Sequence, residues 1–244
     1  MTAWRRIQKT QKENVDENIL IVLKLPKNLE KIYLDAKHFR IKKKPYTLYV
    51  ALDANTKKPI CWILLARYEL KEGYDRILSF LRRRNYRIRA VISDKHMGLI
   101  SSVKDYYPLA IHQRCAFHVL QEVYRKIGGK WFLSTGTGKE IWPIFRKIAL
   151  RFDNYFEARD YLKKSKRKYP DYRKGFMVLE KSLEDIYKFS YLPNLNIQRT
   201  SNQIENFMGI LEQRLKTFRS IKTPQTLIKI ITSFIRIKYK RPTK

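Results

Sequence analysis

The 244-residue chain carries 53 Lys and Arg against 22 Asp and Glu, which gives a formal net charge of +31. Such a charge is most easily understood if a polyanion screens it, and nucleic acid is the leading candidate. Adaptation to a hot habitat would raise the Lys and Glu contents together, so it does not account for this excess of basic residues. A hydrophobic content of 44% excludes a disordered basic tail.

Residues 1–30 form a short basic N-terminal segment whose one apolar run is closed by Pro26, and no complete DNA-reading module fits there. Three strands rich in Ile, Leu, Val, Tyr or Trp are predicted next, over residues 30–36, 45–53 and 59–69. The turn residues between Asp53 and Pro59 fit a hairpin, so we assign Asp53 to that turn. The three strands are expected to form an antiparallel meander.

Helices and strands then alternate. A helix is predicted over 73–85, a strand over 87–93, a helix over 98–106, a strand over 108–112 and a helix over 116–127. A right-handed crossover should make the fourth strand parallel to the first, and ligands collect beyond the carboxyl ends of such strands. We therefore predict an α/β fold with a mixed five-stranded sheet flanked by helices.

The chain from residue 130 onward is predicted to be helical. Residues 130–198 are very basic and show no strand alternation, so we interpret them as a helical insertion. The core would then span residues 31–129 and be completed by residues 199–244. Two amphipathic helices are expected in that completion, over 202–218 and 224–239.

Three acidic residues stand out. Asp35 and Asp94 each end a strand-like run, and Glu205 lies at the start of a predicted helix. A carboxylate fits poorly in a half-buried strand without a counter-charge, and clustered carboxylates stay ionised most readily around a cation such as Mg²⁺. Each acid has another interpretation. Glu205 could complete a capping box with Asn202, Asp94 could cap the following helix, and Asp35 could be an exposed strand end.

Three blocks of the sequence resemble the catalytic core of the mutator-like cut-and-paste transposases and their prokaryotic insertion-sequence relatives. They are YLDAKHFRIKKKPYTLYVALDA, VISDKHMGLISSVKDYYPLAIHQRCAFHVLQEV and QRTSNQIENFMGILEQRLKTF. The resemblance implies a ribonuclease-H-like fold with a helical insertion before the last catalytic helix. It also implies a DDE site in which Asp35, Asp94 and Glu205 hold two Mg²⁺ or Mn²⁺ ions, with Asp35 between them.

Cys115 and His118 match the C-x-x-H element of that family. A structural zinc site generally takes four ligands, and no second ligand pair is evident. Two interpretations of this pair stay open: a buried thiol with a His packed beside it, and a role that places His118 near DNA. The cations that we consider as further DNA contacts are Arg114, Arg199, Arg214, Lys216 and Arg219.

The partners implied by the resemblance are double-stranded DNA, as transposon ends and target, and a second copy in a synaptic homodimer. Two ions roughly 4 Å apart can activate a water or a 3′-hydroxyl and stabilise the leaving oxygen of an in-line displacement. Relatives carry an N-terminal region that recognises transposon ends, and only about 30 residues precede the first strand here. A truncated or inactive DNA-binding copy and a ribonuclease-H-like nuclease therefore stay open as alternatives.

The sequence gives no sign of a membrane segment. Its longest apolar run, PICWILLA, is far shorter than the roughly 20 residues that a membrane helix needs, and the N-terminus has no signal-peptide core. Cys61 and Cys115 make no disulfide framework and are expected to be reduced. We therefore expect a cytoplasmic, nucleoid-associated protein.

Overall fold

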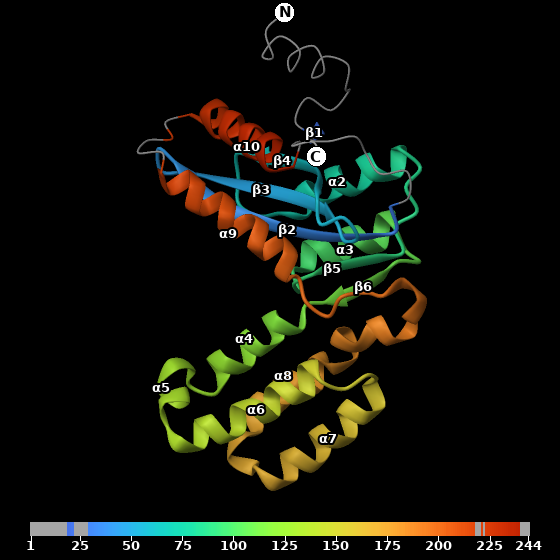
Figure 1. Ribbon diagram of the computed structural model, residues 1–244, viewed down its shortest axis with the longest axis vertical. Helices are drawn as coiled ribbons and strands as arrows, with labels where there is room; N and C mark the ends of the chain where they lie inside the picture. The colour runs from blue at the N-terminus through green and yellow to red at the C-terminus, as the bar shows by residue number, and fades with distance from the viewer. Residues whose placement is uncertain (1–18, 22–28, 218–220, 222, 240–244) are drawn as a thin grey trace, which may run out of the picture. The chain divides into compact units, whose positions relative to one another are not determined.

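The computed structural model describes residues 19–21, 29–217, 221 and 223–239 (Figure 1). The chain divides into two compact units. Unit 1 comprises the described residues within 1–89, 96–109 and 202–244, and unit 2 comprises residues 90–95 and 110–201. Within the described ranges, no helix has the length and apolar character needed to cross a membrane.

Unit 1 contains an antiparallel set of strands. They are β1 (Ile19–Ile21), β2 (Lys31–Ile41), β3 (Lys44–Asp53) and β4 (Pro59–Leu65). β1 pairs with β4, β4 with β3, and β3 with β2. The predicted meander is confirmed, and β1 is an additional strand that sequence reasoning left within the N-terminal segment.

Unit 2 contributes a parallel pair, β5 (Ala90–Ser93) and β6 (Ile111–Arg114). Parallel and antiparallel strands together make a mixed sheet of six described strands. The predicted mixed sheet with flanking helices is thus confirmed, with β2 to β6 as the five expected strands. Antiparallel hairpins followed by alternating helices and strands are the element order that the resemblance to a ribonuclease-H-like core implied.

The prediction that Asp35 ends its strand is wrong. β2 continues to Ile41 and pairs with β3 residue by residue until a two-residue turn joins them. Asp35 therefore lies in the middle of an 11-residue strand, opposite Val50. The turn is Lys42-Lys43, which lacks the Asn-Gly signal of a tight hairpin, so the sequence concealed where the strand ends.

The assignment of Asp53 to a turn is confirmed. Its carboxylate accepts hydrogen bonds from the Asn55 amide at 3.0 Å and from the Thr56 hydroxyl at 2.6 Å. These local bonds satisfy an acid that is only 2% exposed. Asp53 is thereby removed as a competitor for metal ligation.

Four helices cover the strands of unit 1. They are α2 (Lys71–Arg83), α3 (Met97–Tyr106), α9 (Asn202–Thr217) and α10 (Pro224–Tyr239). α2 packs on α3, while α9 packs on β2 and contacts α10, which lies beside it (Figure 1). α9 buries the predicted stripe of Ile204, Phe207, Met208, Leu211 and Leu215. Its sequence pattern therefore fixes which face meets the sheet.

Helices dominate unit 2. They are α4 (Ala116–Lys126), α5 (Gly129–Ser134), α6 (Gly136–Leu150), α7 (Tyr155–Lys168) and α8 (Arg173–Tyr187), followed by short 3-10 turns over Lys188–Tyr191 and Pro193–Leu195. Their shared core joins Val119 and Val123 of α4 to Phe145, Phe176 and Leu179. The predicted helical character of this segment is confirmed, and its core includes α4.

Candidate functional site

Two of the three predicted acids belong to unit 1. Asp35 is half-buried on β2, where its Oδ1 accepts a hydrogen bond of 2.8 Å from the Ala36 amide. Glu205 is half-buried in the first turn of α9, the helix that packs on β2. Neither side chain is fully exposed, as expected of carboxylates that serve a site.

An ion pair aligns α9 with β2. The Lys37 Nζ lies 2.7 Å from Glu212 Oε2, and this contact, followed by that of Lys216, lowers the pKa of Glu212. Lys37 follows Asp35 by two residues and so shares its strand face, while Glu212 lies two helical turns after Glu205 on the same side of α9.

The directions of the two elements decide where the acids lie. Figure 1 shows β2 and α9 running toward the same side of unit 1. Asp35 precedes Lys37 by about 7 Å along the strand, and Glu205 precedes Glu212 by about 10 Å along the helix. Asp35 and Glu205 therefore lie on facing surfaces of β2 and α9.

Asp94 belongs to unit 2, where it directly follows β5 and is half-buried. The preceding Ser93 hydroxyl donates to the Asp94 carbonyl oxygen at 2.9 Å and lies 2.7 Å from His112 Nε2. Burial, together with the positive charge of Lys188, lowers the pKa of His112 to about 4. His112 is thus a neutral support behind the end of β5, which sequence reasoning missed because it read this residue only as a strand end.

Cys115 and His118 form a hydrogen-bonded pair at the start of α4. The Ser201 amide donates to Cys115 Sγ at 3.2 Å. Burial by itself would raise the pKa of the Cys115 thiol, but hydrogen bonds with His118 and Ser201 outweigh it and lower the pKa. The C-x-x-H element therefore ties α4 to the segment that precedes Asn202.

Two cations predicted to contact DNA have partners inside unit 2. Arg114 is 5% exposed, with its Nη2 at 2.9 Å from Glu122 Oε2 and its Nη1 bonded to the Ser182 hydroxyl. The Arg199 Nη1 donates to the Leu150 carbonyl at 2.6 Å, and its guanidinium lies 4.3 Å from the Phe189 ring centroid. Internal partners of this kind favour a packing role for both guanidinium groups, and their contact with DNA stays a prediction.

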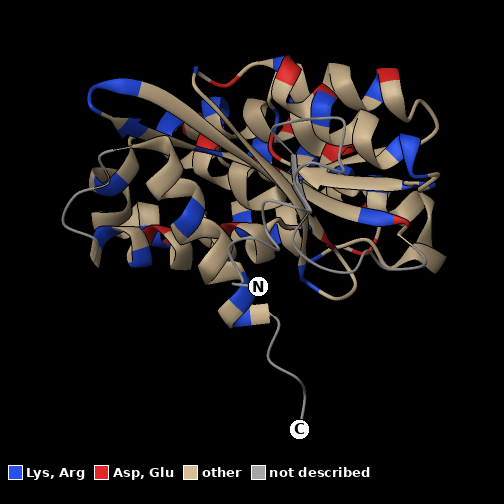
Figure 2. Ribbon diagram, turned by 90° about the horizontal axis from the view of Figure 1, so that it is seen from above, with Lys and Arg blue, Asp and Glu red and all other residues tan. Residues whose placement is uncertain are grey.

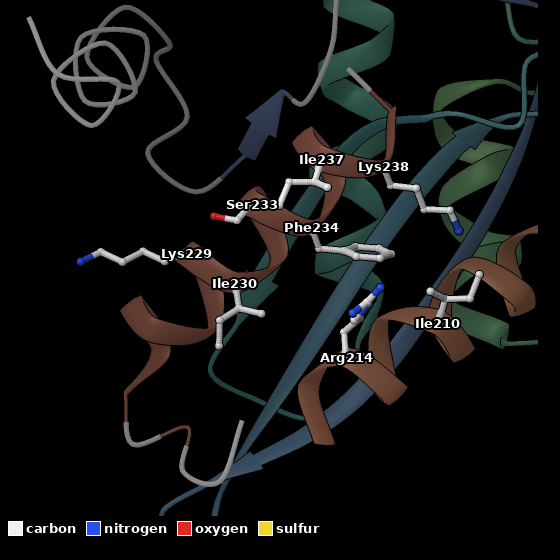
Figure 3. Close-up of a pocket in the computed structure, with 8 residues that line it drawn as sticks. All are labelled: Ile210, Arg214, Lys229, Ile230, Ser233, Phe234, Ile237 and Lys238. Carbon is white, nitrogen blue, oxygen red and sulfur yellow. The ribbon is translucent and has the colours of Figure 1, made fainter. Parts of the chain in front are cut away.

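The remaining predicted cations lie on α9 or just after it. Arg214 is exposed in a groove of about 700 Å³ between α9 and α10, where Figure 3 shows it pointing toward Phe234. Lys238 lines the same groove, and partial burial lowers its pKa. Lys216 is 73% exposed and pairs with Glu212 at 3.2 Å. Arg219 lies outside the described residues.

Asn202 is the first residue of α9 and is exposed. Glu205 follows it by three residues in the first turn. A capping box between these two residues stays a prediction.

Glu69 is a further acid that sequence reasoning missed. It lies between two histidines of unit 1, 3.1 Å from His38 Nε2 and 3.4 Å from His96 Nδ1, and it also accepts from the Tyr74 hydroxyl. His38, Glu69 and His96 line a cavity of about 520 Å³ beside the C-terminal end of β2. The one sequence signal for this cluster was that His38 follows Asp35, and His96 follows Asp94, within a few residues.

The donor set fits a hard divalent ion. Asp35, Asp94 and Glu205 offer carboxylate oxygens, which are the ligands that Mg²⁺ and Mn²⁺ prefer. All three are half-buried. This degree of burial leaves room for substrate oxygens while it strengthens the attraction between a carboxylate and a cation.

Comparisons with known protein sequences match this chain to transposases. A family model described as "Transposase, Mutator family" matches residues 6–237. The transposases for insertion sequence element IS256 in transposon Tn4001 of Staphylococcus aureus and Enterococcus faecalis are each 23% identical over 182 residues, which cover 74% of this chain and 46% of the relative. The chain thus spans about half the length of these curated relatives.

Solved structures give weaker matches. The Drosophila P element transposase strand transfer complex aligns with a TM-score of 0.49 and 13% identity, covering 86% of this chain and 77% of that chain. The HTLV-2 integrase catalytic core domain in complex with magnesium aligns with a TM-score of 0.28 and 11% identity, covering 51% and 88%.

Proposed function

Because the chain belongs to the Mutator family of transposases, we propose that it is a DDE transposase catalytic domain that cuts and joins double-stranded DNA by in-line phosphoryl transfer. The family match across residues 6–237 is the observation that carries the proposal. The facing placement of Asp35 and Glu205 on β2 and α9 supports it. We extend the proposal to transposon ends and target as substrates and to a homodimer in the synaptic complex.

Asp35, Asp94 and Glu205 would hold two divalent cations, Mg²⁺ or Mn²⁺. When bound, such a pair activates a water or 3′-hydroxyl and stabilises the leaving oxygen. Of these three acids, Asp35 and Glu205 belong to unit 1 and Asp94 belongs to unit 2. The Lys37–Glu212 ion pair holds α9 in register on β2 and so orients two of the three carboxylates. The neutral His112 supports the backbone at Asp94 without adding charge.

Further residues of the proposed DNA surface are His118, Arg214 and Lys216. The last two are exposed on the helix that carries Glu205. They are able to reach phosphates without first breaking an internal network, since Arg214 lines an open groove and Lys216 forms only an exposed ion pair.

The test uses strand transfer with DNA from the ends that flank the gene, in Mn²⁺. We expect joined products with the wild-type chain and none with Asp35→Asn, Asp94→Asn or Glu205→Gln, while DNA binding and circular dichroism are kept. Glu140→Gln is the matched control, since Glu140 is an exposed acid on α6. Nicked DNA without joined products would indicate a hydrolytic nuclease. Activity that survives in all three variants would refute the proposed metal site.

A further inference from the structure

The turn between β2 and β3 has an unfavourable backbone for its sequence. Lys42 and Lys43 form the two-residue loop, with φ values of 48° and 67°, and the flanking residues Ile41 and Lys44 are paired. Two positive φ values in such a loop are typical of a type I′ turn, which strongly favours Asn-Gly. A lysine has a Cβ that disfavours this region, so both positions are strained.

The same turn concentrates positive charge. We call Arg40, Lys42, Lys43 and Lys44 the lysine tip, and all four are exposed. Within the described parts of the chain, none of them forms an ion pair with an acidic side chain. Figure 2 shows the hairpin turn at the left as a continuous blue segment. Mutual repulsion therefore adds to the backbone strain.

The hairpin at the other end of β3 is built differently. It also contains a lysine at positive φ, Lys57 at 59°. There, however, the Asp53 carboxylate bonds Asn55 and Thr56 and stabilises the turn. The lysine tip has no such side-chain support among the described residues. Folding alone would favour a different sequence at Lys42 and Lys43, and strain that folding does not need is commonly kept for function.

We propose that the lysine tip grips the phosphate backbone of duplex DNA. This inference rests on the proposed function for its substrate class, but it concerns binding and needs no catalysis. Lysine ammonium groups bind phosphates as point charges, and a two-stranded ribbon is narrow enough to lie along a groove of DNA. Phosphates are alike at every base pair, so a contact with the phosphate backbone reads no sequence.

The strand sets the distance of this contact from the proposed metal site. Lys42 follows Asp35 by seven residues on β2, which is about 23 Å along an extended strand. DNA that follows the strand is therefore held about seven base pairs from the phosphate at Asp35, at 3.4 Å per base pair. Ethylation of phosphates at that separation should interfere with binding.

Lys42→Asn/Lys43→Gly tests the proposal, because it installs the preferred turn sequence and removes two charges together. We expect a thermal midpoint equal to or above that of the wild type. Affinity for a random-sequence DNA duplex should fall about tenfold or more near 0.1 M salt, and the slope of log K against log salt should shrink by about 1.8. Measurements in EDTA exclude catalysis, so this result does not depend on whether strand transfer is observed.

Lys57→Gly/Lys58→Asn is the matched control, since it removes the same charge and one positive-φ lysine at the opposite end of β3. It should keep the wild-type affinity and salt slope. Equal losses in both double variants, or wild-type binding by the lysine-tip variant, would overturn the proposal. Loss of affinity for duplex RNA with unchanged affinity for duplex DNA would overturn it as well.

Discussion

Arg114 offers a direct test of whether a cation beside a family motif serves DNA or the protein interior. Its guanidinium is bonded to Glu122 and Ser182 within unit 2. We predict that Arg114→Ala destabilises the folded chain and leaves DNA affinity nearly unchanged. A DNA-contacting arginine would show the opposite pattern.

Three terms set the expected loss of stability. The Ser182 residue is 2% exposed, so a hydroxyl without its partner costs about 1–3 kcal/mol. Removal of the buried alkyl stem of Arg114 costs about 1–2 kcal/mol in lost packing. The Glu122 side chain is 39% exposed and regains water, so its term is small. The sum is about 2–5 kcal/mol.

Urea denaturation followed by circular dichroism measures this loss, and titration with duplex DNA at several salt concentrations measures binding. Arg125→Ala on α4, the helix that carries Glu122, is the control, because Arg125 is exposed and should change stability by no more than about 0.5 kcal/mol. An Arg114→Ala variant with the wild-type urea midpoint and a salt slope reduced by about one would refute the assignment of Arg114 to the interior.

Two further predictions concern packing and pH. A Cβ on Gly73 would lie 2.2 Å from the ring of buried Tyr49, so Gly73→Ala should cost about 1–3 kcal/mol, whereas Gly209→Ala, which meets nothing within 4 Å in α9, should add about 0.5–1 kcal/mol. Thermal midpoints that move in the same direction would contradict this contrast. The folded pKa of His112 is about 4 against an ordinary 6.5, so the unfolded chain takes the proton first. The stability that the neutral ring contributes should be complete above pH 6.5 and fall by about 3 kcal/mol as the pH drops toward 4. Urea midpoints across this window should vary less in His112→Gln, and an unchanged pH profile in that variant would show that another group is responsible.

Local patterns predicted the helices well because their signals are short-ranged. The C-terminal helix was expected over residues 224–239 and occupies Pro224–Tyr239, with proline at a first-turn position that suits it and a regular apolar stripe behind it. The turn at Asp53 was likewise predicted from side-chain chemistry within three residues. Such features need no knowledge of the rest of the chain.

Features that depend on distant partners were not predicted. β1 has three residues, and only its pairing with β4 makes it a strand. The ion pair that joins α9 to β2 links Lys37 and Glu212, which are 175 residues apart. Asp35 seemed to end a strand because the strained Lys42-Lys43 turn carries no hairpin signal. In each case tertiary contacts decided what local pattern left open.

The cations show why net charge identifies a partner class and not a surface. A guanidinium has five donors in a planar fork, so it satisfies several internal acceptors at once and tolerates burial, as Arg114 and Arg199 do. A lysine ammonium is strongly hydrated and stays in water unless it is paired. Arginines beside a family motif are therefore poor candidates for DNA contacts when an internal carboxylate or carbonyl is within reach. Exposed lysines in an otherwise unfavourable turn are better ones, because neither packing nor backbone conformation accounts for them.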